Sequence, residues 1–140
     1  MQGGLNINSV PDHAEFTIDI RSTTMTRHQD ILQRLHQELG DEIAIETLVD
    51  LDPVSTVESD PFVQLAYDTC GADHRSDKWP RSLPYLTDGS VLQPYYGGVP
   101  TIILGPGEPE MAHKTDEYCF IKNIIQSVSI YKNIILNRIT

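Results

Sequence analysis

The fold class follows from one stretch in the second half of the chain, residues 97–107, which reads Gly-Gly-Val-Pro-Thr-Ile-Ile-Leu-Gly-Pro-Gly. Its centre, residues 99–104, is a short and largely apolar run with glycines on both sides. A run of this length between turn residues is typical of a central strand that is covered on both faces. The stretch therefore predicts an α/β fold in which residues 99–104 form a buried strand.

Two helices are expected around this strand. Residues 61–70 follow a capping residue, Asp60, and end before a glycine. Residues 115–137 predict a longer helix, with Asp116 and Glu117 in a first turn where the helix dipole favours acids. One apolar stripe runs along this helix and consists of Ile121, Ile124, Ile125, Val128, Tyr131 and Ile135.

The first part of the chain predicts a β-α-β unit. Residues 14–21 alternate strictly between apolar and polar side chains, as a half-buried strand does. An amphipathic helix follows, with Thr26 and Gln29 as a capping box at its start and Gly40 at its end. A second strand is expected at residues 43–49. Because such a unit cannot hide both of its faces, we expect it to be part of something larger.

A boundary is expected between these two parts. Residues 50–60 lack periodicity, carry an excess of acids and contain a proline, which is typical of a linker. The sequence therefore predicts one part at residues 1–52 and a second part at residues 53–140. Exposed apolar surface on such parts would favour a partner chain, a swapped dimer or marginal stability.

Composition and charge exclude several classes of protein. Ten Lys and Arg against twenty Asp and Glu give a formal charge of -10 over 140 residues, and the basic residues are scattered, so we expect neither nucleic acid nor a membrane as a partner. No apolar stretch approaches the roughly 18 residues of a membrane span, and the N-terminus lacks the layout of a signal peptide. The spacing of Cys70 and Cys119 indicates reduced thiols in a cytoplasmic protein.

Among the histidines, His113 is the strongest candidate for chemistry. It lies between the predicted strand at 99–104 and the last helix, and ligands of open α/β sheets bind in loops at this end of the strands. A neutral imidazole there suits a metal ligand, and an ordinary loop histidine is the alternative. The remaining histidines have the simpler interpretation of solvated side chains, and they are His13, His28, His36 and His74.

A second candidate is the segment 84–92, where a short strand is expected to run into a turn. Thr87 or Asp88 either caps the following segment or contacts a substrate, and Gly89 suits close approach of the backbone. Other chemistries are not indicated, since the chain has no G-x-S-x-G elbow and no glycine-rich phosphate loop. Cys119 falls in an expected apolar helix, which favours a buried structural thiol.

Several short motifs occur in a fixed order along the chain. They are Gly3-Gly4, Asn8-Ser9-Val10-Pro11-Asp12, Asp19-Ile20-Arg21, Tyr85-Leu86-Thr87-Asp88-Gly89, Gly105-Pro106-Gly107 and Ala112-His113-Lys114-Thr115-Asp116-Glu117-Tyr118. Their order and spacing resemble the M20 metallopeptidase family, which includes acetylornithine deacetylase and succinyl-diaminopimelate desuccinylase. The resemblance covers essentially the whole chain, and the last motifs look more similar to acetylornithine deacetylase than to strict desuccinylases.

This resemblance implies a fold, an assembly and a cofactor. Residues 1–52 would be the second half of a ferredoxin-like lid that forms a homodimer, and residues 53–140 the C-terminal part of an α/β zinc-hydrolase catalytic domain. The implied reaction is metal-assisted hydrolysis of the amide bond in an N-acylated amino acid. Two zinc ions would serve the full-length enzyme, with cobalt or another divalent metal as a substitute.

The resemblance also implies roles for single residues. His113 resembles the last zinc ligand of the family. Asn8 and Arg21 resemble lid residues near the substrate, and the forked donors of an arginine suit a carboxylate. The pocket wall would consist of Thr87, Asp88, Gly89, Gly105 and Gly107.

The chain departs from the family pattern in one large respect. The other metal ligands and the catalytic glutamate of the family belong to sequence upstream of these residues, whereas a zinc site needs three protein ligands besides water. We therefore expect the C-terminal portion of a zinc-dependent amidohydrolase that is inactive alone. The alternative is a non-catalytic dimerisation or regulatory module derived from the same fold.

Overall fold

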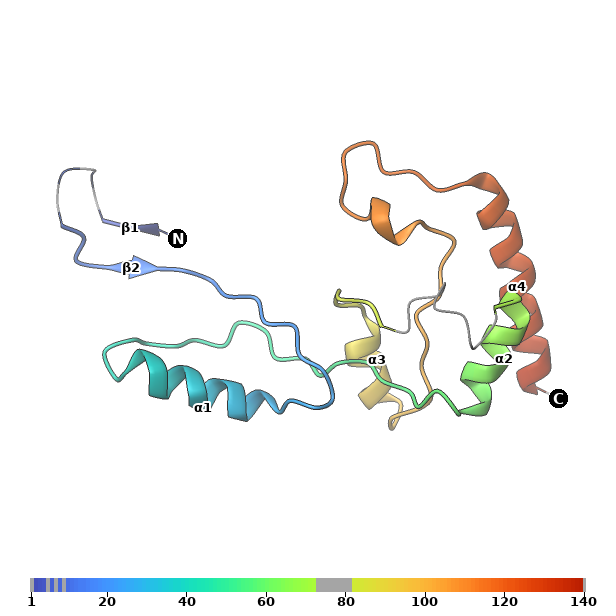
Figure 1. Cartoon of the computed structure of the whole chain (residues 1–140), viewed down its shortest axis with the longest axis horizontal. Helices are drawn as coiled ribbons and strands as arrows, with labels where there is room; N and C mark the ends of the chain where they lie inside the picture. The colour runs from blue at the N-terminus through green and yellow to red at the C-terminus, as the bar shows by residue number, and fades with distance from the viewer. Residues whose placement is uncertain (1, 5, 7, 9, 73–81, 140) are drawn as a thin grey trace.

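A computed structural model describes residues 2–4, 6, 8, 10–72 and 82–139 of the chain, so His74 lies outside the described residues. The secondary structure of the described residues is mostly helical (Figure 1). In chain order the elements are β1 (Gln2–Gly3), β2 (Ala14–Glu15), α1 (His28–Leu39), α2 (Pro61–Cys70), α3 (Gly89–Tyr95), the 3-10 turn η1 (Pro109–Met111) and α4 (Ile121–Ile139). No described helix is long and apolar enough to span a lipid bilayer.

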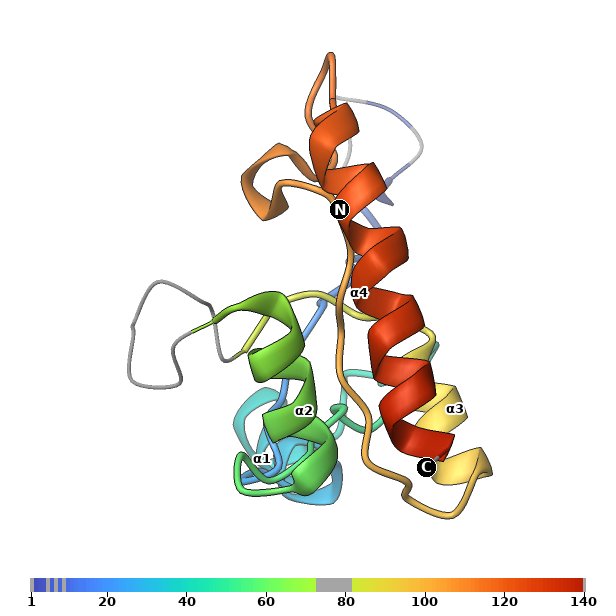
Figure 2. The same cartoon turned by 90° about the vertical axis from the view of Figure 1, so that its right-hand side faces the viewer.

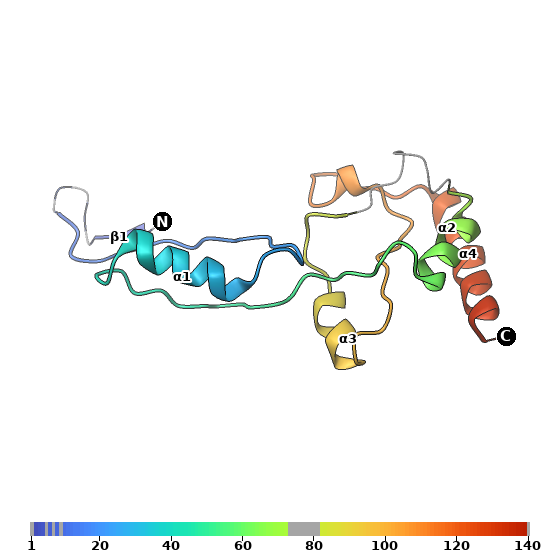
Figure 3. The ribbon, with the colours of Figure 1, turned by 60° about the horizontal axis from the view of Figure 1, so that its bottom comes forward.

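The described residues up to residue 50 form an elongated arm (Figures 1 and 3). β1 pairs antiparallel with β2, with Gln2 opposite Glu15 and Gly3 opposite Ala14. The chain then runs along the arm, turns back through α1 and returns as an extended segment beside that helix (Figure 3). It passes from the arm into the rest of the molecule near residues 50–53, so this segment is the covalent link between the two parts.

The small core of the second part lies around α2 and α4, which pack against one another (Figure 2). Ala66 of α2 and Ile134 of α4 are buried, and so is Ala72 just beyond the end of α2. α3 stands apart from this pair, beside the chain segments that lead to and from it (Figure 3). Apolar burial in the described part of the chain is therefore concentrated at one helix pair, while Gly89 and Ser90 are buried at the start of α3.

Local signals predicted the ends of two helices. The Asp60 carboxylate accepts a hydrogen bond of 2.8 Å from the backbone N–H of Phe62, and α2 ends at Gly71, whose φ of 64° is left-handed. Gly40 ends α1 with a φ of 79°. The predicted capping box is wrong, because α1 begins after Arg27 without a side-chain cap and Thr26 lies outside the helix.

The start of the last helix differs from the prediction. α4 begins at Ile121 and not at residue 115. Asp116 has a φ of 61°, and a left-handed residue cannot continue a right-handed helix. Asp116 and Glu117 therefore lie in the preceding loop and not in the first helical turn.

The predicted long strands are wrong in the described structure. Of residues 14–21 only Ala14–Glu15 pair with another strand, while residues 43–49, 84–86 and 99–104 have no ladder partner among the described residues. A strand needs a neighbour for its backbone N–H and C=O groups, and β1 is too short to supply one beyond Glu15. The apolar side of 14–21 is about half exposed, with Phe16 at 54%, Ile18 at 52% and Ile20 at 47%.

Side chains take the place of a neighbouring strand along residues 99–104. The Thr56 hydroxyl donates to the carbonyl of Thr101 at 2.7 Å and accepts from its N–H at 2.8 Å. Gln93 of α3 donates to the carbonyls of Ser55 at 2.9 Å and Val99 at 3.2 Å. These bonds hold the run against the linker and α3, although it is not the buried strand that its sequence predicts.

The exposed surface is large for a chain of this size. It amounts to 11,975 Å², whereas a compact monomer of 15.7 kDa exposes about 7,300 Å². Much of the excess is apolar, including Ile121, Ile125 and Val128 on α4. The described fold therefore leaves many apolar side chains exposed, because its small core cannot bury them.

Candidate functional site

The loop from Gly105 to Phe120 carries the histidine that the sequence analysis singled out. Asn123, in the first turn of α4, donates its side-chain N–H to the carbonyl of Pro106 at 3.2 Å and to the carboxylate of Glu108 at 3.0 Å. The Cys119 thiol donates to the same Pro106 carbonyl at 3.2 Å. Both ends of the loop are thereby tied to one point beside α4.

His113 is exposed at the surface of this loop. Its φ of 61° is left-handed, which is uncommon for a residue other than glycine and is found more often at functional sites than elsewhere. Its backbone N–H donates to Glu117 Oε2 at 3.3 Å, and within the described chain no hydrogen bond to its imidazole is seen. The loop thus presents an accessible imidazole on a strained backbone.

The Thr87 to Gly89 segment leads into α3. Asp88 occupies the N-cap position, but its side chain accepts no cap hydrogen bond, so the predicted capping role is not observed in the described helix. Gly89 is buried, and a Cβ atom there would lie 2.9 Å from Val54 Cγ2 and 3.1 Å from Thr87 Oγ1. The close approach predicted for this glycine is present, and its neighbours are protein atoms.

Gly105 and Gly107 have a different environment. Neither has a positive φ, and a Cβ atom at either position would meet nothing within 4 Å. Backbone conformation and packing within the chain therefore do not require glycine at these two positions. Open space beside them is compatible with the pocket wall that the family resemblance implies.

The two lid residues of the prediction lie on the arm. Arg21 Nη2 donates to Asp19 Oδ2 at 2.6 Å and Nε donates to the same oxygen at 3.1 Å, so a carboxylate of the chain itself occupies the forked donors. Asn8 is exposed in the connection between β1 and β2. β1 and β2 lie at the far end of the arm from the loop before α4, so the structure does not bring this end of the arm and that loop together (Figure 1).

A polar cluster that sequence reasoning missed lies where the arm meets the rest of the molecule. The His28 side chain is only 23% exposed; Nε2 lies 2.6 Å from Ser22 Oγ and Nδ1 pairs with Asp50 Oδ1. The predicted solvated role of His28 is therefore wrong. Its partners are 6 and 22 residues away, so no local pattern marks them.

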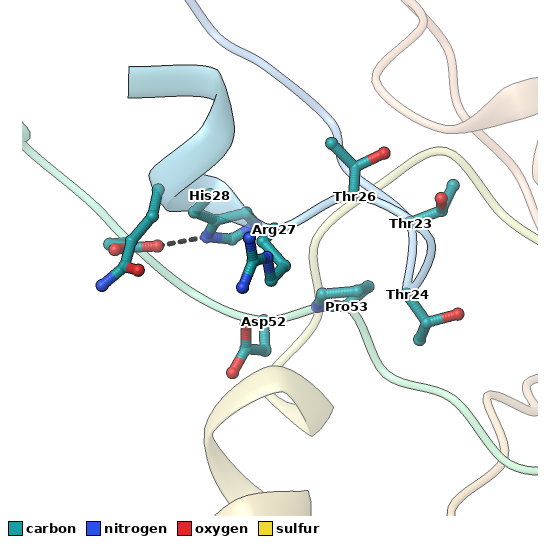
Figure 4. Close-up of a pocket in the computed structure, with 9 residues that line it drawn as sticks. Thr23, Thr24, Thr26, Arg27, His28, Asp52 and Pro53 are labelled. Carbon is teal, nitrogen blue, oxygen red and sulfur yellow. Dashed lines mark hydrogen bonds and ion pairs between the residues drawn. The ribbon is translucent and has the colours of Figure 1, made fainter. Parts of the chain in front are cut away.

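This cluster borders a cavity of about 530 Å³, and the dashed line in Figure 4 marks the ion pair of His28. Three hydroxyl side chains from the turn before α1 face it, together with polar side chains from the start of α1 and from the linker. The lining residues are Thr23, Thr24, Thr26, Arg27, His28, Gln29, Asp50, Asp52 and Pro53. None of the predicted site residues belongs to this set.

The number of metal-binding side chains that lie together decides whether the described residues fit a zinc site. In the described ranges no group of three or more His, Cys, Asp or Glu side chains is close enough to hold a metal ion. A protein zinc site needs three or four such ligands. The described residues therefore do not fit a complete metal centre, and His113 alone would supply one ligand.

The thiols do not extend the site. Burial raises the pKa of the Cys70 thiol, which keeps it in the neutral and less nucleophilic form. Cys119 is half-buried and hydrogen-bonded to Pro106. Both cysteines are free, as the sequence indicates.

Comparison with known proteins identifies the family. Residues 3–137 match the family described as Peptidase family M20/M25/M40. The chain belongs to this family. The resemblance predicted from the motifs is thereby confirmed, and the family is one of hydrolases.

Curated relatives of this M20 family chain carry two kinds of name. A probable succinyl-diaminopimelate desuccinylase of Staphylococcus aureus (strain Mu50) is 27% identical over 138 residues, which cover 94% of this chain and 34% of the relative. An acetylornithine deacetylase of Aliivibrio fischeri is 30% identical over 103 residues, or 73% of this chain and 25% of the relative. The chain thus spans about a third of the relatives' length or less. No solved structure gives a significant match.

Proposed function

We propose that this M20 family chain is the C-terminal portion of an amidohydrolase that removes an acyl group from an N-acylated amino acid. The observation that supports this is the family match over residues 3–137, with relatives named as a desuccinylase and a deacetylase. The substrates of those relatives share one chemistry, an amide between a short acyl group and the nitrogen of an amino acid. Acetylornithine is the substrate that we favour, and succinyl-diaminopimelate is the second.

His113 would contribute one ligand to a zinc centre whose other ligands come from outside this chain. Its exposed imidazole, its left-handed backbone and the absence of a three-residue metal group within the described ranges support this division. Thr87, Asp88, Gly105 and Gly107 would form the wall beside it. Asp88 is exposed and uses no side-chain cap bond, so its carboxylate is available to a substrate ammonium group.

The remaining part of the enzyme would cover the apolar surface that this chain leaves open. The exposed side of α4 and the unpaired run at residues 99–104 belong to the same part of the molecule as the His113 loop (Figures 1 and 2). A sheet that pairs with residues 99–104 would bury Ile103, which is 44% exposed. The arm would form the dimer contact of the complete enzyme, and the chain alone would be inactive.

One observation favours the alternative of a non-catalytic module. The forked donors of Arg21 are held by Asp19, so a substrate carboxylate would have to replace an existing ion pair. An exposed pair of this kind is worth at most about 1 kcal/mol, which a substrate carboxylate can overcome. The hydrolase is therefore the better supported function.

The test is a hybrid in which this chain replaces the matching third of the Staphylococcus aureus relative. With zinc or cobalt, we expect the hybrid to release amino acid from acetylornithine or succinyl-diaminopimelate, and the chain alone to release none. His113→Ala should abolish turnover in the hybrid and lower its metal content, whereas His36→Ala on α1 should change neither. A folded hybrid that binds no zinc would favour the module, and turnover by the chain alone would contradict the division of ligands.

A further inference from the structure

Three hydrogen-bonding side chains meet at the base of the arm, and each comes from a different segment. Ser22 follows the extended segment after β2, His28 is the first residue of α1, and Asp50 ends the segment that returns along α1. Ser22 Oγ lies 2.6 Å from His28 Nε2. His28 Nδ1 pairs with Asp50 Oδ1, as the dashed line in Figure 4 marks. His28 thus connects two segments that are 28 residues apart in the sequence.

The chemistry of the partners assigns the protons of this cluster. An ionised carboxylate can only accept, so Nδ1 of His28 carries a proton and donates it to Asp50. In the neutral ring Nε2 is then the acceptor, and the Ser22 hydroxyl donates to it. All three groups are satisfied in one arrangement, which selects a single tautomer of His28.

The position of the cluster gives it a mechanical role. α1 has no buried residue, and in the described chain its packing against another helix or strand is not observed. The cluster therefore holds the start of α1 and the returning segment together at the point where the chain leaves the arm. Thr24, two residues after Ser22, lines a second cavity of about 320 Å³ together with Ser90 and Gln93 of the α3 region.

We infer that Ser22, His28 and Asp50 form a positioning device that holds the two segments of the arm together at its base, where the chain passes into the rest of the molecule. This inference does not depend on the proposed hydrolase function. The hydrogen bonds run from serine to histidine to aspartate, as they do in a hydrolytic triad. Ser22 does not line either of the two described cavities, so the geometry supports a role in holding the chain and not in attacking a substrate.

The first test uses the unmodified chain. Long-range proton–nitrogen NMR spectra at about pH 8.5, where an ordinary imidazole is neutral, report which ring nitrogen carries the proton. We expect the Nδ1–H tautomer at His28. His36, on the same helix, makes no side-chain hydrogen bond in the described structure and serves as the reference for a solvated ring. An Nε2–H tautomer at His28 would overturn the inference.

The second test compares two aspartates of the same cavity. Asp50→Ala removes the partner of His28, whereas Asp52→Ala removes a nearby carboxylate that makes no hydrogen bond to a described residue. We expect Asp50→Ala to speed trypsin cleavage after Arg21 and Arg27 about tenfold, because cleavage follows local opening and a bond to a charged group is lost. Asp52→Ala should leave both rates unchanged.

The other outcomes of this comparison contradict the inference. Equal effects of the two variants would show a general loss of negative charge and not a specific bond. An equal rise in cleavage after Lys122 and Lys132 of α4 would show that Asp50 supports the whole fold and not the base of the arm. Unchanged cleavage rates in Asp50→Ala would show that the hydrogen bonds of the cluster do not stabilise the base of the arm.

Discussion

Gly89 shows most directly how single residues shape the candidate site. A Cβ atom there would lie 2.9 Å from Val54 Cγ2, and valine is stiff about χ1. We expect Gly89→Ala to lower the free energy of unfolding by about 1–3 kcal/mol through overpacking, as measured by urea titration with circular dichroism. Gly105→Ala, whose Cβ would meet nothing within 4 Å, should stay within about 0.5 kcal/mol of the parent. Equal effects of the two variants would contradict this account.

Sequence reasoning at the residue scale succeeded where the signal is local. The cap at Asp60 and the glycine ends of α1 and α2 all depend on neighbours in the chain. His28 was misjudged because its partners, Ser22 and Asp50, become neighbours only through the fold. The roles proposed for His113 and the pocket wall stay predictions, since they come from the family resemblance.

α4 allows a sharper test at the scale of an element, because two adjacent isoleucines face different surroundings. Ile134 is 8% exposed and Ile135 is 56% exposed. We expect Ile134→Ala to cost about 2–4 kcal/mol in urea unfolding, since it opens a cavity in the core around α2 and α4. Ile135→Ala removes the same atoms from an exposed site and should cost less than about 1 kcal/mol. If Ile135→Ala lowered the free energy of unfolding as much as Ile134→Ala does, this face of α4 would be covered, which would contradict the described exposure.

Helices were predicted better than strands, and the reason is physical. A helix satisfies its backbone within its own segment, so the apolar stripe and the end signals suffice to locate α2 and most of α4. A strand requires a neighbour that its own sequence does not contain. Residues 99–104 have the composition of a central strand, yet in the described structure Thr56, Gln93 and Tyr131 supply their hydrogen bonds.

The whole molecule should be extended in solution. Its 11,975 Å² of surface and its arm predict a radius of gyration clearly above the roughly 14 Å of a compact chain of this length. Small-angle X-ray scattering across a concentration series measures this value, and light scattering shows the mass of the scattering species. A monomer with a radius near 14 Å would contradict the described arrangement.

The ferredoxin-like lid and the α/β domain stay predictions for the whole molecule. The described residues form helices and a single short ladder. The division near residues 50–60 also stays a prediction; the structure has no helix or strand in that segment. The family resemblance came from short motifs, because these report local chemistry and do not depend on pairing between distant segments.

Asn123 connects two scales of this molecule. Its side chain belongs to the helix whose open face would meet the remainder of the enzyme, and it also grips the loop that displays His113. A surface that packs against α4 would therefore act on the His113 loop through the side-chain amide of Asn123. Under the proposed function, packing against α4 and placement of the His113 ligand would then be coupled through Asn123.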